Sequence, residues 1–437
     1  MHNQSSVLKI SCDINLMDTT KSYEVKDLSL AQQGSLNIEY AEAFMPIMQK
    51  IRKRFEKEKP FQGLTIGLAL HITKETAVLV RTLRAGGAKV ALASCNPLST
   101  QDDIAAALAK DGFMVYGYKG EGKEDYYRYI EAVIAAKPDI TIDDGCDLVT
   151  ALHTKHKDLL KGMVGGCEET TTGVIRLHAM EKDGVLKYPM IAVNDNKTKH
   201  LLDNYYGTGQ SSIDGLLRAT NVLIAGKNFV VCGYGDCGKG LAMRAKGMGA
   251  NVIVTEVDAF RAMQAKLDGH SIMPIAEAAK IGDIFVTVTG NKNVITTEHI
   301  RAMKNNSILA NSGHFDNEID VAGMEKLWGK TKRKIRPQLE EYDVDGKKIF
   351  LCAQGRLVNL AAAEGHPSEV MATSFAGQSL ACEYLVKNKG KLPVKVITLP
   401  EQIDNDIASL QLEAMCVKKD TLTKEQDKYL HSWEEGT

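Results

Sequence analysis

A short apolar run that ends in a glycine-rich turn constrains this chain more than any other feature. It spans residues 227–238, reads KNFVVCGYGDCG, and ends in the pattern G-x-G-x-x-G. A helix-compatible stretch, 239–249, and a second apolar run, 252–255, follow before Glu256. A strand, a glycine turn, a helix and a second strand in this order predict a βαβ unit that binds a dinucleotide.

Each glycine of this turn has its own expected role. Gly233 allows a tight turn, Gly235 lets backbone N–H groups approach a pyrophosphate, and Gly238 lets the helix and strand pack closely. The positive end of the helix dipole favours the phosphates. Glu256 lies 18 residues after Gly238, in reach of an adenosine ribose, and its carboxylate repels a 2′-phosphate. The segment therefore predicts NAD rather than NADP as the cofactor.

Composition and charge exclude several classes of protein. The 437 residues suggest two or three domains, and the net charge of −1 gives no electrostatic case for binding nucleic acid or an anionic membrane. The start, Met1–Ile10, lacks the pattern of a signal peptide, and no apolar run is long enough to span a bilayer. Nine scattered cysteines without a C-x-x-C pair predict reduced thiols, a cytoplasmic protein and no metal site.

Apolar runs alternate with amphipathic segments along most of the chain, which predicts parallel α/β architecture. The expected strands are 64–70, 89–94, 140–142 and 191–193, and then 229–232, 252–255, 284–289, 307–310 and 349–353. The expected helices are 73–85 capped by Thr73, 99–110 capped by Ser99, 367–387 and 407–417, with a partly helical connector at 198–226. The fold class is α/β, with two doubly wound domains, the second a Rossmann domain, and a short, mostly helical C-terminal tail.

Four polar segments follow expected strand ends, where open α/β sheets bind ligands. They are 71–75 (HITKE), 143–147 (DDGCD), 168–173 (EETTTG) and 194–204 (NDNKTKHLLDN). Each has a structural alternative: helix capping for the first and third, a solvated loop for the second, and a surface ion pair between Lys199 and Asp203 for the fourth. His314 and His366 each stand beside a glycine, and a single histidine is more often structural than catalytic.

Taken together, these segments resemble the S-adenosyl-L-homocysteine hydrolase family from about Val25 to about Pro400. The matching segments are 71–77 (HITKETA), 143–145 (DDG), 168–174 (EETTTGV), 233–236 (GYGD), 313–316 (GHFD) with 318–320 (EID), and 355–360 (GRLVNL).

The resemblance implies a hydrolase that keeps NAD tightly bound. Oxidation of the ribose 3′-hydroxyl to a ketone acidifies the C4′ proton, and loss of that proton expels homocysteine by β-elimination. Water then adds to the 4′,5′-alkene, and return of the hydride gives adenosine. The cofactor ends as it began, so the implied net reaction is the reversible hydrolysis of S-adenosyl-L-homocysteine to adenosine and L-homocysteine.

The resemblance also assigns roles to matching positions. The implied catalytic residues are His71, Asp144, Glu169, Lys199 and Asp203, and the implied substrate-binding residues are Thr73, Glu75, His314 and His366. The implied NAD-binding residues are Thr170, Thr171, Thr172, Asn204, Gly233, Gly235, Asp236, Gly238, Glu256 and Asn359. Burial beside a positive nicotinamide is expected to make Lys199 more acidic than in water, so that it can take the 3′-hydroxyl proton.

The family pattern further implies domain limits and partners. A substrate domain at 1–200 is completed by 366–400, a NAD-binding domain with its hinge occupies 201–365, and a tail covers 401–437. The expected partners are small-molecule substrates and further copies of the chain in a homotetramer, with no nucleic acid or membrane.

The chain departs from the family pattern at four places. Its end, 430–437 (LHSWEEGT), lacks the Lys-Pro-Asp-x-Tyr-Arg-Tyr signature of many members. Glu364 replaces a methionine at the adenine, Thr208 replaces a cysteine near the nicotinamide, and Arg261 replaces an asparagine near the NAD adenosine ribose. An arginine there would tolerate a 2′-phosphate, which Glu256 opposes.

Three alternatives follow. A hydrolase of S-inosyl-L-homocysteine would use the same mechanism, although Glu75 accepts hydrogen bonds and so favours adenine. A catalytically silent NAD-binding partner protein would have lost acid/base residues that this chain keeps. A simple 2-hydroxyacid dehydrogenase would not need such groups in so many segments.

Overall fold

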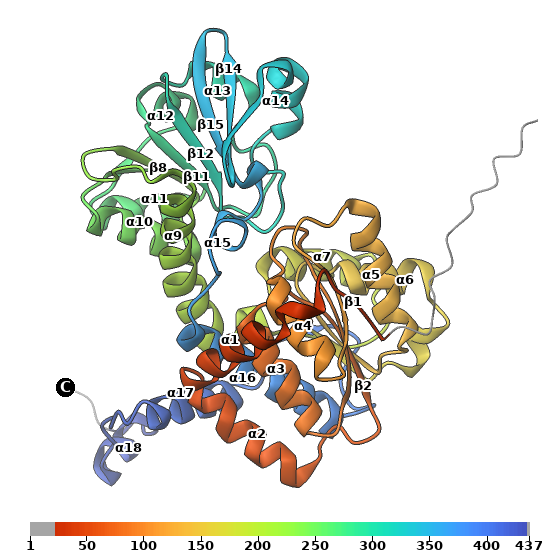
Figure 1. The fold of residues 1–437 in the computed structure, drawn as a ribbon. Helices are drawn as coiled ribbons and strands as arrows, with labels where there is room; N and C mark the ends of the chain where they lie inside the picture. Colours follow the sequence, from red (N-terminus) through yellow and green to blue (C-terminus); the bar gives the residue numbers. More distant parts are fainter. Residues whose placement is uncertain (1–21, 435–437) are drawn as a thin grey trace, which may run out of the picture.

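The computed structural model describes residues 22–434, so the expectations for Met1–Ile10 and for the thiol of Cys12 lie outside the described residues. Two lobes, each built on its own eight-stranded sheet, make up the molecule (Figure 1). The expected α/β class with two doubly wound domains is confirmed. Within residues 22–434 no helix combines the length and the apolar character that a bilayer crossing requires.

The first sheet has the order β1-β4-β3-β2-β5-β6-β7-β16, and all its strand pairs are parallel. Its strands are β1 (Tyr23–Glu24), β2 (Thr65–Ala69), β3 (Lys89–Ala93), β4 (Met114–Tyr116), β5 (Ile140–Asp143), β6 (Gly165–Glu168), β7 (Met190–Ala192) and β16 (Val396–Ile397). Its helices are α1 (Ala31–Ala43), α2 (Pro46–Glu58), α3 (Lys74–Ala85), α4 (Asp102–Lys110), α5 (Lys123–Ala135), α6 (Asp147–Lys155), α7 (Thr171–Lys182) and α16 (Ser368–Lys387).

Helices cover both faces of this sheet, which explains why its strands read as continuous apolar runs. Side chains of α1–α4 and α16, such as Ile38, Ile104 and Phe375, pack in one core cluster with the strands. Side chains of α5 and α6, such as Tyr129 and Leu152, form a second cluster. The strand order reverses between β2 and β5, so the loops that follow these two strands diverge and leave a crevice at the carboxyl edge.

The second sheet has the order β10-β9-β8-β11-β12-β15-β14-β13 and reverses between β8 and β11. Its strands are β8 (Asn228–Cys232), β9 (Asn251–Thr255), β10 (Ser271–Ile272), β11 (Ile284–Thr287), β12 (Ser307–Asn311), β13 (Arg333–Arg336), β14 (Leu339–Val344) and β15 (Lys347–Cys352). Its helices are α9 (Thr208–Thr220), α10 (Asp236–Gly247), α11 (Ala259–Leu267), α12 (Ile275–Ile281), α13 (Thr297–Ala302), α14 (Val321–Trp328) and α15 (Val358–Ala361).

One expectation about an individual element is wrong. The helix expected at 99–110 begins only at Asp102, and Ser99 does not cap it, because the Ser99 hydroxyl instead donates to the carbonyl of Asn96. The strand expected at 349–353 is present as β15, which pairs parallel with β12 on one side and antiparallel with β14 on the other. All four residues of the edge strand β13 are exposed and read RKIR, so no apolar run marks this strand in the sequence.

The connector between the lobes is helical in pieces, as expected. It contains α8 (Lys197–Lys199), a π-helix, η4 (His200–Gly207), and α9. In Figure 1, α9 and the segment around α15 run between the lobes. After α16, the chain ends in α17 (Glu401–Ala414), which begins earlier than expected, and α18 (Lys424–Leu430).

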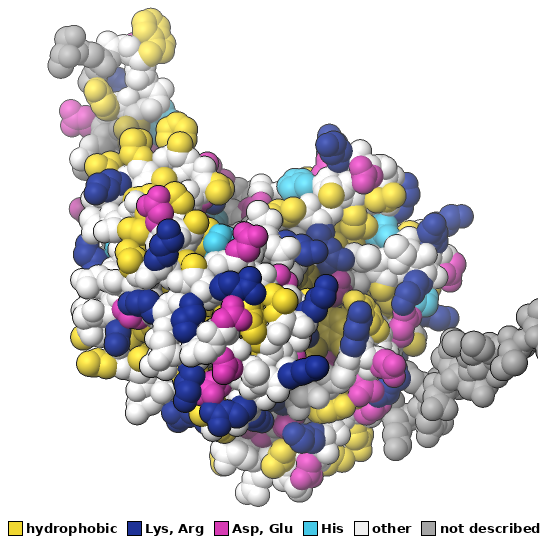
Figure 2. All heavy atoms as spheres, turned by 90° about the horizontal axis from the view of Figure 1, so that it is seen from above, with side chains coloured by type: hydrophobic (Ala, Val, Ile, Leu, Met, Phe, Trp, Pro, Cys, Tyr) yellow, Lys and Arg dark blue, Asp and Glu magenta, His cyan; other side chains and the backbone are white. Residues whose placement is uncertain are grey.

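The surface carries charges of both signs. On the face drawn in Figure 2, lysine and arginine side chains are interspersed with aspartate and glutamate. This mixture agrees with the net charge of −1, which gives no electrostatic case for binding nucleic acid.

Candidate active site

A cavity of about 1120 Å³ lies where the two lobes meet, at the carboxyl edges of both sheets. Of the residues that the sequence singles out for the site, all except Gly238 line it. Residues far apart in the sequence converge here because each sheet reverses its strand order at this edge.

The glycine loop connects β8 to α10 and leaves room for a ligand. Gly233 has φ of +110°, which side chains disfavour. A Cβ on Gly238 would lie 2.1 Å from the carbonyl oxygen of Gly233, so this glycine is needed for close packing. A Cβ on Gly235 would meet only Arg261, 3.7 Å away, and would otherwise occupy open space. That space at a helix N-terminus is a cradle suited to a pyrophosphate.

Glu256 follows β9 and is held by three backbone N–H groups. Its carboxylate accepts hydrogen bonds from Tyr234 at 2.7 Å, from Val257 at 2.7 Å and from Asp258 at 3.0 Å. The carboxylate is therefore fixed beside the glycine loop, where it can meet a ribose and oppose a 2′-phosphate.

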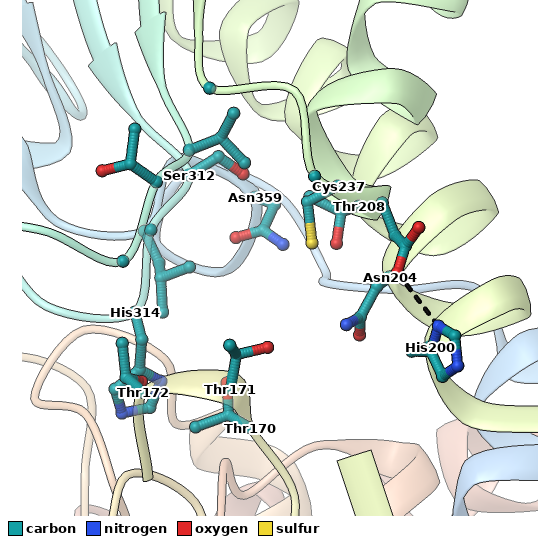
Figure 3. A pocket seen from close by; sticks show the side chains of 18 of the residues that line it. Thr170, Thr171, Thr172, His200, Asn204, Thr208, Cys237, Ser312, His314 and Asn359 are labelled. Carbon is teal, nitrogen blue, oxygen red and sulfur yellow. Dashed lines mark hydrogen bonds and ion pairs between the residues drawn. The ribbon is translucent and has the colours of Figure 1, made fainter. Parts of the chain in front are cut away.

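Two buried polar atoms of residues that line the cavity have no hydrogen-bond partner within residues 22–434. They are the Thr172 hydroxyl, from the first turn of α7, and the Asn359 side-chain oxygen, from α15. Figure 3 shows both side chains beside the cavity, with Asn204 and Thr208 across from the threonines. Since buried polar groups are normally paired, these atoms suit a ligand such as the carboxamide of a nicotinamide. The residues present thus fit NAD.

A buried lysine stands at the centre of the site. The Lys199 ammonium lies 3.1 Å from an Asp203 oxygen, 2.8 Å from the Asn204 side-chain oxygen and 3.7 Å from a Glu169 oxygen. Lys199 is 5 % and Asp203 2 % exposed, so the alternative of a surface ion pair is wrong. The two residues lie four apart as predicted, but they are brought together at the start of a π-helix.

The charges around Lys199 oppose its expected acidity. Burial lowers the pKa of Lys199, but the carboxylates of Asp203, Glu169 and Asp144 outweigh burial and raise it above the ordinary value. The residues around Lys199 within 22–434 thus raise its pKa overall, and the expected acidity depends on a further positive charge nearby. Burial would raise the pKa of Asp203, but His366, whose Nδ1 contacts its carboxylate, and Lys199 hold it well below its usual range.

Glu169 is buried against helix α16. Its carboxylate accepts hydrogen bonds from the Ser374 hydroxyl and from the Gln378 side-chain N–H, the latter at 2.5 Å. Burial raises the pKa of Glu169 to about 7 against the opposing charge of Lys199. This carboxyl can therefore change its protonation state near neutral pH.

A second acid/base cluster joins the two lobes. Asp144, after β5, lies 3.3 Å from His71 Nε2 and 3.4 Å from His314 Nδ1. His71 follows β2, and its Nδ1 lies 2.7 Å from the Ser99 hydroxyl. Burial lowers the pKa of His71 to about 4 although Asp144 opposes this, so the ring is neutral at pH 7. A neutral imidazole beside a carboxylate can accept or deliver a proton.

The other predicted substrate-binding residues line the same cavity. Thr73 caps α3 by accepting from the N–H of Thr76. Glu75 is 1 % exposed and accepts a hydrogen bond from Ser368 at 2.7 Å. The His366 Nε2 lies 3.3 Å from the Thr208 hydroxyl. Thr73 therefore caps the helix and also lines the cavity, so the two roles do not exclude each other.

Several residues of the site went unnoticed in the sequence. Ser368, Ser374 and Gln378 all come from α16, where polar residues interrupt a buried helix at spacings of six and four. The spacing of four is a usable signal, because it places Ser374 and Gln378 on one helix face, whereas a spacing of six places Ser368 on another. His200 lies on the π-helical connector, and its Nδ1 lies 3.0 Å from an Asp236 carboxylate oxygen. No pattern in the sequence predicts this pair.

Three atoms of metal-binding type also meet in the site. Ligand atoms of His71, Cys95 and Asp144 lie within 4.8 Å of one another. The expectation that the protein binds no metal stays untested.

Comparison with known proteins gives matches over both lobes. Residues 22–159 match the model of S-adenosyl-L-homocysteine hydrolase, and residues 204–365 match the model of that family's NAD-binding domain. The chain is 57 % identical over 415 residues to an S-inosyl-L-homocysteine hydrolase of Methanocaldococcus jannaschii, which covers 95 % of this chain and 100 % of the relative. It is 57 % identical over 418 residues to an adenosylhomocysteinase of Saccharolobus solfataricus, with 95 % and 100 % covered. An adenosylhomocysteinase of Aquifex aeolicus is 57 % identical over 417 residues, with the same coverage.

Proposed function

Because the chain belongs to the S-adenosyl-L-homocysteine hydrolase family, we propose that it reversibly hydrolyses S-adenosyl-L-homocysteine to adenosine and L-homocysteine. One observation carries this proposal beyond family membership. A single cavity brings together a dinucleotide cradle, a buried Lys199–Asp203 pair and a separate Asp144–His71–His314 cluster. Oxidation at one ribose carbon and elimination at its neighbours need two such sets of groups.

NAD is the cofactor of this family's second domain, and when bound it supplies reversible hydride transfer at the ribose C3′. The glycine loop, with Gly233, Gly235, Asp236 and Gly238, is assigned to the pyrophosphate, and Glu256 to the adenosine ribose. The remaining assigned positions, at the nicotinamide end, are Thr170, Thr171, Thr172, Asn204 and Asn359.

Lys199 is assigned the proton of the 3′-hydroxyl. Asp203 and Asn204 hold its side chain by contacts of 3.1 and 2.8 Å, and His366 in turn holds Asp203. Glu169, 3.7 Å from the ammonium, is assigned to the ribose hydroxyls. The carboxylates that raise the pKa of Lys199 also fix its position. The side chain is thus already oriented, and once a positive nicotinamide beside it has favoured loss of its own proton, the neutral amine can accept the proton of the 3′-hydroxyl.

Asp144 and His71 are assigned the proton chemistry at C4′ and C5′. One takes the C4′ proton, and the other gives a proton to the leaving homocysteine sulfur and later takes one from the attacking water. His314 contacts Asp144 from the second lobe and is assigned to the homocysteine end. Closure of the two lobes around these groups would exclude bulk water from the elimination.

The test is direct. Purified protein incubated with S-adenosyl-L-homocysteine should release free thiol and adenosine, and removal of the dinucleotide should abolish that release. A protein that retains NAD but releases no thiol would instead be a silent NAD-binding protein. Retention of full activity without dinucleotide would contradict the mechanism.

Finer features extend the proposal. We propose domain limits at 1–200 with 366–400, 201–365, and 401–437, supported by the return of β16 to the first sheet. We also propose a cytoplasmic homotetramer acting in one-carbon metabolism. The eight cysteines within residues 22–434 are free thiols, which agrees with a reducing compartment. Light scattering tests the assembly.

A further inference from the structure

One part of the cavity carries an acid/base cluster and another carries an ion-pair cluster. This difference indicates where the purine of the substrate binds. From Lys199, one direction leads to the acid/base cluster of Asp144, His71 and His314. Elimination at C4′ and C5′ requires such groups beside the homocysteine side of the ribose. The base must then lie away from these three groups, and we place it beside His366, which contacts Asp203, and Glu75, both of which line the cavity. This placement rests on the proposed function.

An ion-pair cluster spans the lobes at this base end. The Lys74 ammonium lies 3.0 Å from an oxygen of Glu364 and 3.5 Å from an oxygen of Glu75. Both carboxylates belong to residues that line the cavity. Lys74 begins α3 of the first lobe, whereas Glu364 follows α15 of the second. Arg218, on α9, also reaches Glu364, at 3.4 Å.

Lys74 and Glu364 both keep their charges. The Lys74 side chain is 12 % exposed; burial lowers its pKa, but Glu75 and Glu364 outweigh burial and raise it. The hydrogen bond from Lys74 holds the pKa of Glu364 below its usual range. Lys74 is therefore only a donor at neutral pH, and Glu364 is only an acceptor. The Lys74 ammonium already contacts two carboxylates, so the groups left to bind a ligand at this end of the cavity are mainly hydrogen-bond acceptors.

The two candidate bases differ at the position that such a cluster can detect. Adenine carries a 6-amino group, a donor, whereas hypoxanthine carries a 6-oxo group, an acceptor. We propose that the Lys74–Glu364 ion pair sets the choice between a 6-aminopurine and a 6-oxopurine, and that the intact pair favours the 6-amino base. Glu364 binds the Lys74 ammonium and so keeps it from donating to a 6-oxo group. Glu364 also adds a second carboxylate, beside Glu75, that can accept a hydrogen bond from a 6-amino group.

The proposal predicts shifts of opposite sign for the two members of the pair. Glu364→Gln removes the charge that holds Lys74, so the ammonium becomes free to donate to a 6-oxo group. The ratio of kcat/KM for S-inosyl- over S-adenosyl-L-homocysteine should rise about three- to tenfold, the range expected for one hydrogen bond. Lys74→Met removes the hydrogen-bond donor that lies between Glu75 and Glu364, so the same ratio should fall by a similar factor.

Two matched variants control for charge changes elsewhere. Glu401→Gln and Lys155→Met each alter an exposed ion pair outside the cavity, with Lys197 and with Glu131 respectively. Neither should change the ratio. Thermal melting, together with retained turnover of the adenosyl compound, verifies that the Lys74 and Glu364 variants are folded.

The experiment separates failure of this inference from failure of the proposed function. Wild-type protein that hydrolyses neither compound overturns the proposed function. If the wild type is active, the specificity proposal is overturned when the two ratios move in the same direction, when only one moves, or when both stay within about twofold of wild type, a difference well below 1 kcal/mol. Opposite shifts support it.

Discussion

The Asp144 carboxylate and the His314 imidazole lie 3.4 Å apart although they come from different sheets of the fold. A Cβ on the neighbouring Gly145 would lie 2.4 Å from the same imidazole, so the histidine packs directly on this loop. The contact makes the arrangement of the two lobes part of the site. Asp144 thereby holds one histidine from each lobe, since His71 lies 3.3 Å away on its other side.

Asp144→Asn should slow the removal of the C4′ proton while leaving 3′-oxidation partly intact. An amide keeps the shape of the side chain but is not a base, and loss of general base catalysis costs about 10²- to 10⁴-fold. The measurement is solvent deuterium exchange at C4′ of bound adenosine, followed by NMR. Exchange at the wild-type rate would remove Asp144 from this step.

Lys199→Met should cut turnover by about 10²-fold or more and slow reduction of bound NAD on addition of adenosine. The side chain is buried and contacts Asp203 and Asn204, so the variant loses both the proton acceptor and its orientation. Stopped-flow absorbance of the reduced nicotinamide gives the rate. Lys197→Met, which affects only the exposed pair with Glu401, is the matched control. Reduction at the normal rate in the Lys199 variant would contradict the assignment.

The buried neutral state of His71 should make the fold sensitive to acid. Its pKa is about 4 in the folded chain, against about 6.5 when unfolded. As the pH falls from 6.5 to 4, the unfolded chain binds the proton first, so stability is lost across that window. The loss is on the order of 2–3 kcal/mol at most. Tm measured against pH should fall less steeply for His71→Asn than for wild type or for a variant of the exposed His431. Parallel curves for all three proteins would refute the shifted pKa.

Gly235→Ala and Gly238→Ala should fail in different ways. The methyl group of Gly235→Ala would meet only Arg261 at 3.7 Å, so this variant should fold normally but bind NAD at least about tenfold more weakly, because the methyl group enters the cradle. The methyl group of Gly238→Ala would clash with the Gly233 carbonyl 2.1 Å away, so this variant should lose about 1–3 kcal/mol of stability. Denaturant unfolding and NAD titration separate the two effects. Equal NAD affinity in Gly235→Ala and wild type would argue against a pyrophosphate in the loop.

Glu256→Gln should weaken the discrimination against NADP. The carboxylate stands beside the glycine loop, held by the backbone of Tyr234, Val257 and Asp258. Removal of its charge leaves Arg261, which lines the same cavity, to face a 2′-phosphate. The ratio of the Kd for NADP to the Kd for NAD, from fluorescence titration of dinucleotide-free protein, should fall about tenfold. An unchanged ratio would show that another group excludes the phosphate.

The sequence predicted the parts of the fold that depend on local patterns. The strands around the glycine loop fall within one or two residues of their expected bounds, because buried parallel strands read as apolar runs and glycine turns mark their ends. The strand β6 went unnoticed, since two of its four residues are glycines, which weaken a strand signal. The predicted cap at Ser99 is wrong because its hydroxyl donates to the Asn96 carbonyl within its own loop and contacts His71 from a different loop.

By itself, the sequence determined the dinucleotide-binding unit, the α/β class and the residue types of the site, because spacing along one chain fixes which groups share a turn or a helix face. Only the tertiary structure decided which ionisable groups lie close enough to change one another's pKa. The pKa of Lys199 is raised by carboxylates from three separate segments, and Glu364 meets Lys74 across the two lobes. Such interactions depend on distances of a few ångströms between segments that are far apart in the sequence. The reversal of strand order in the two sheets brings these segments together, and no local sequence pattern specifies that proximity.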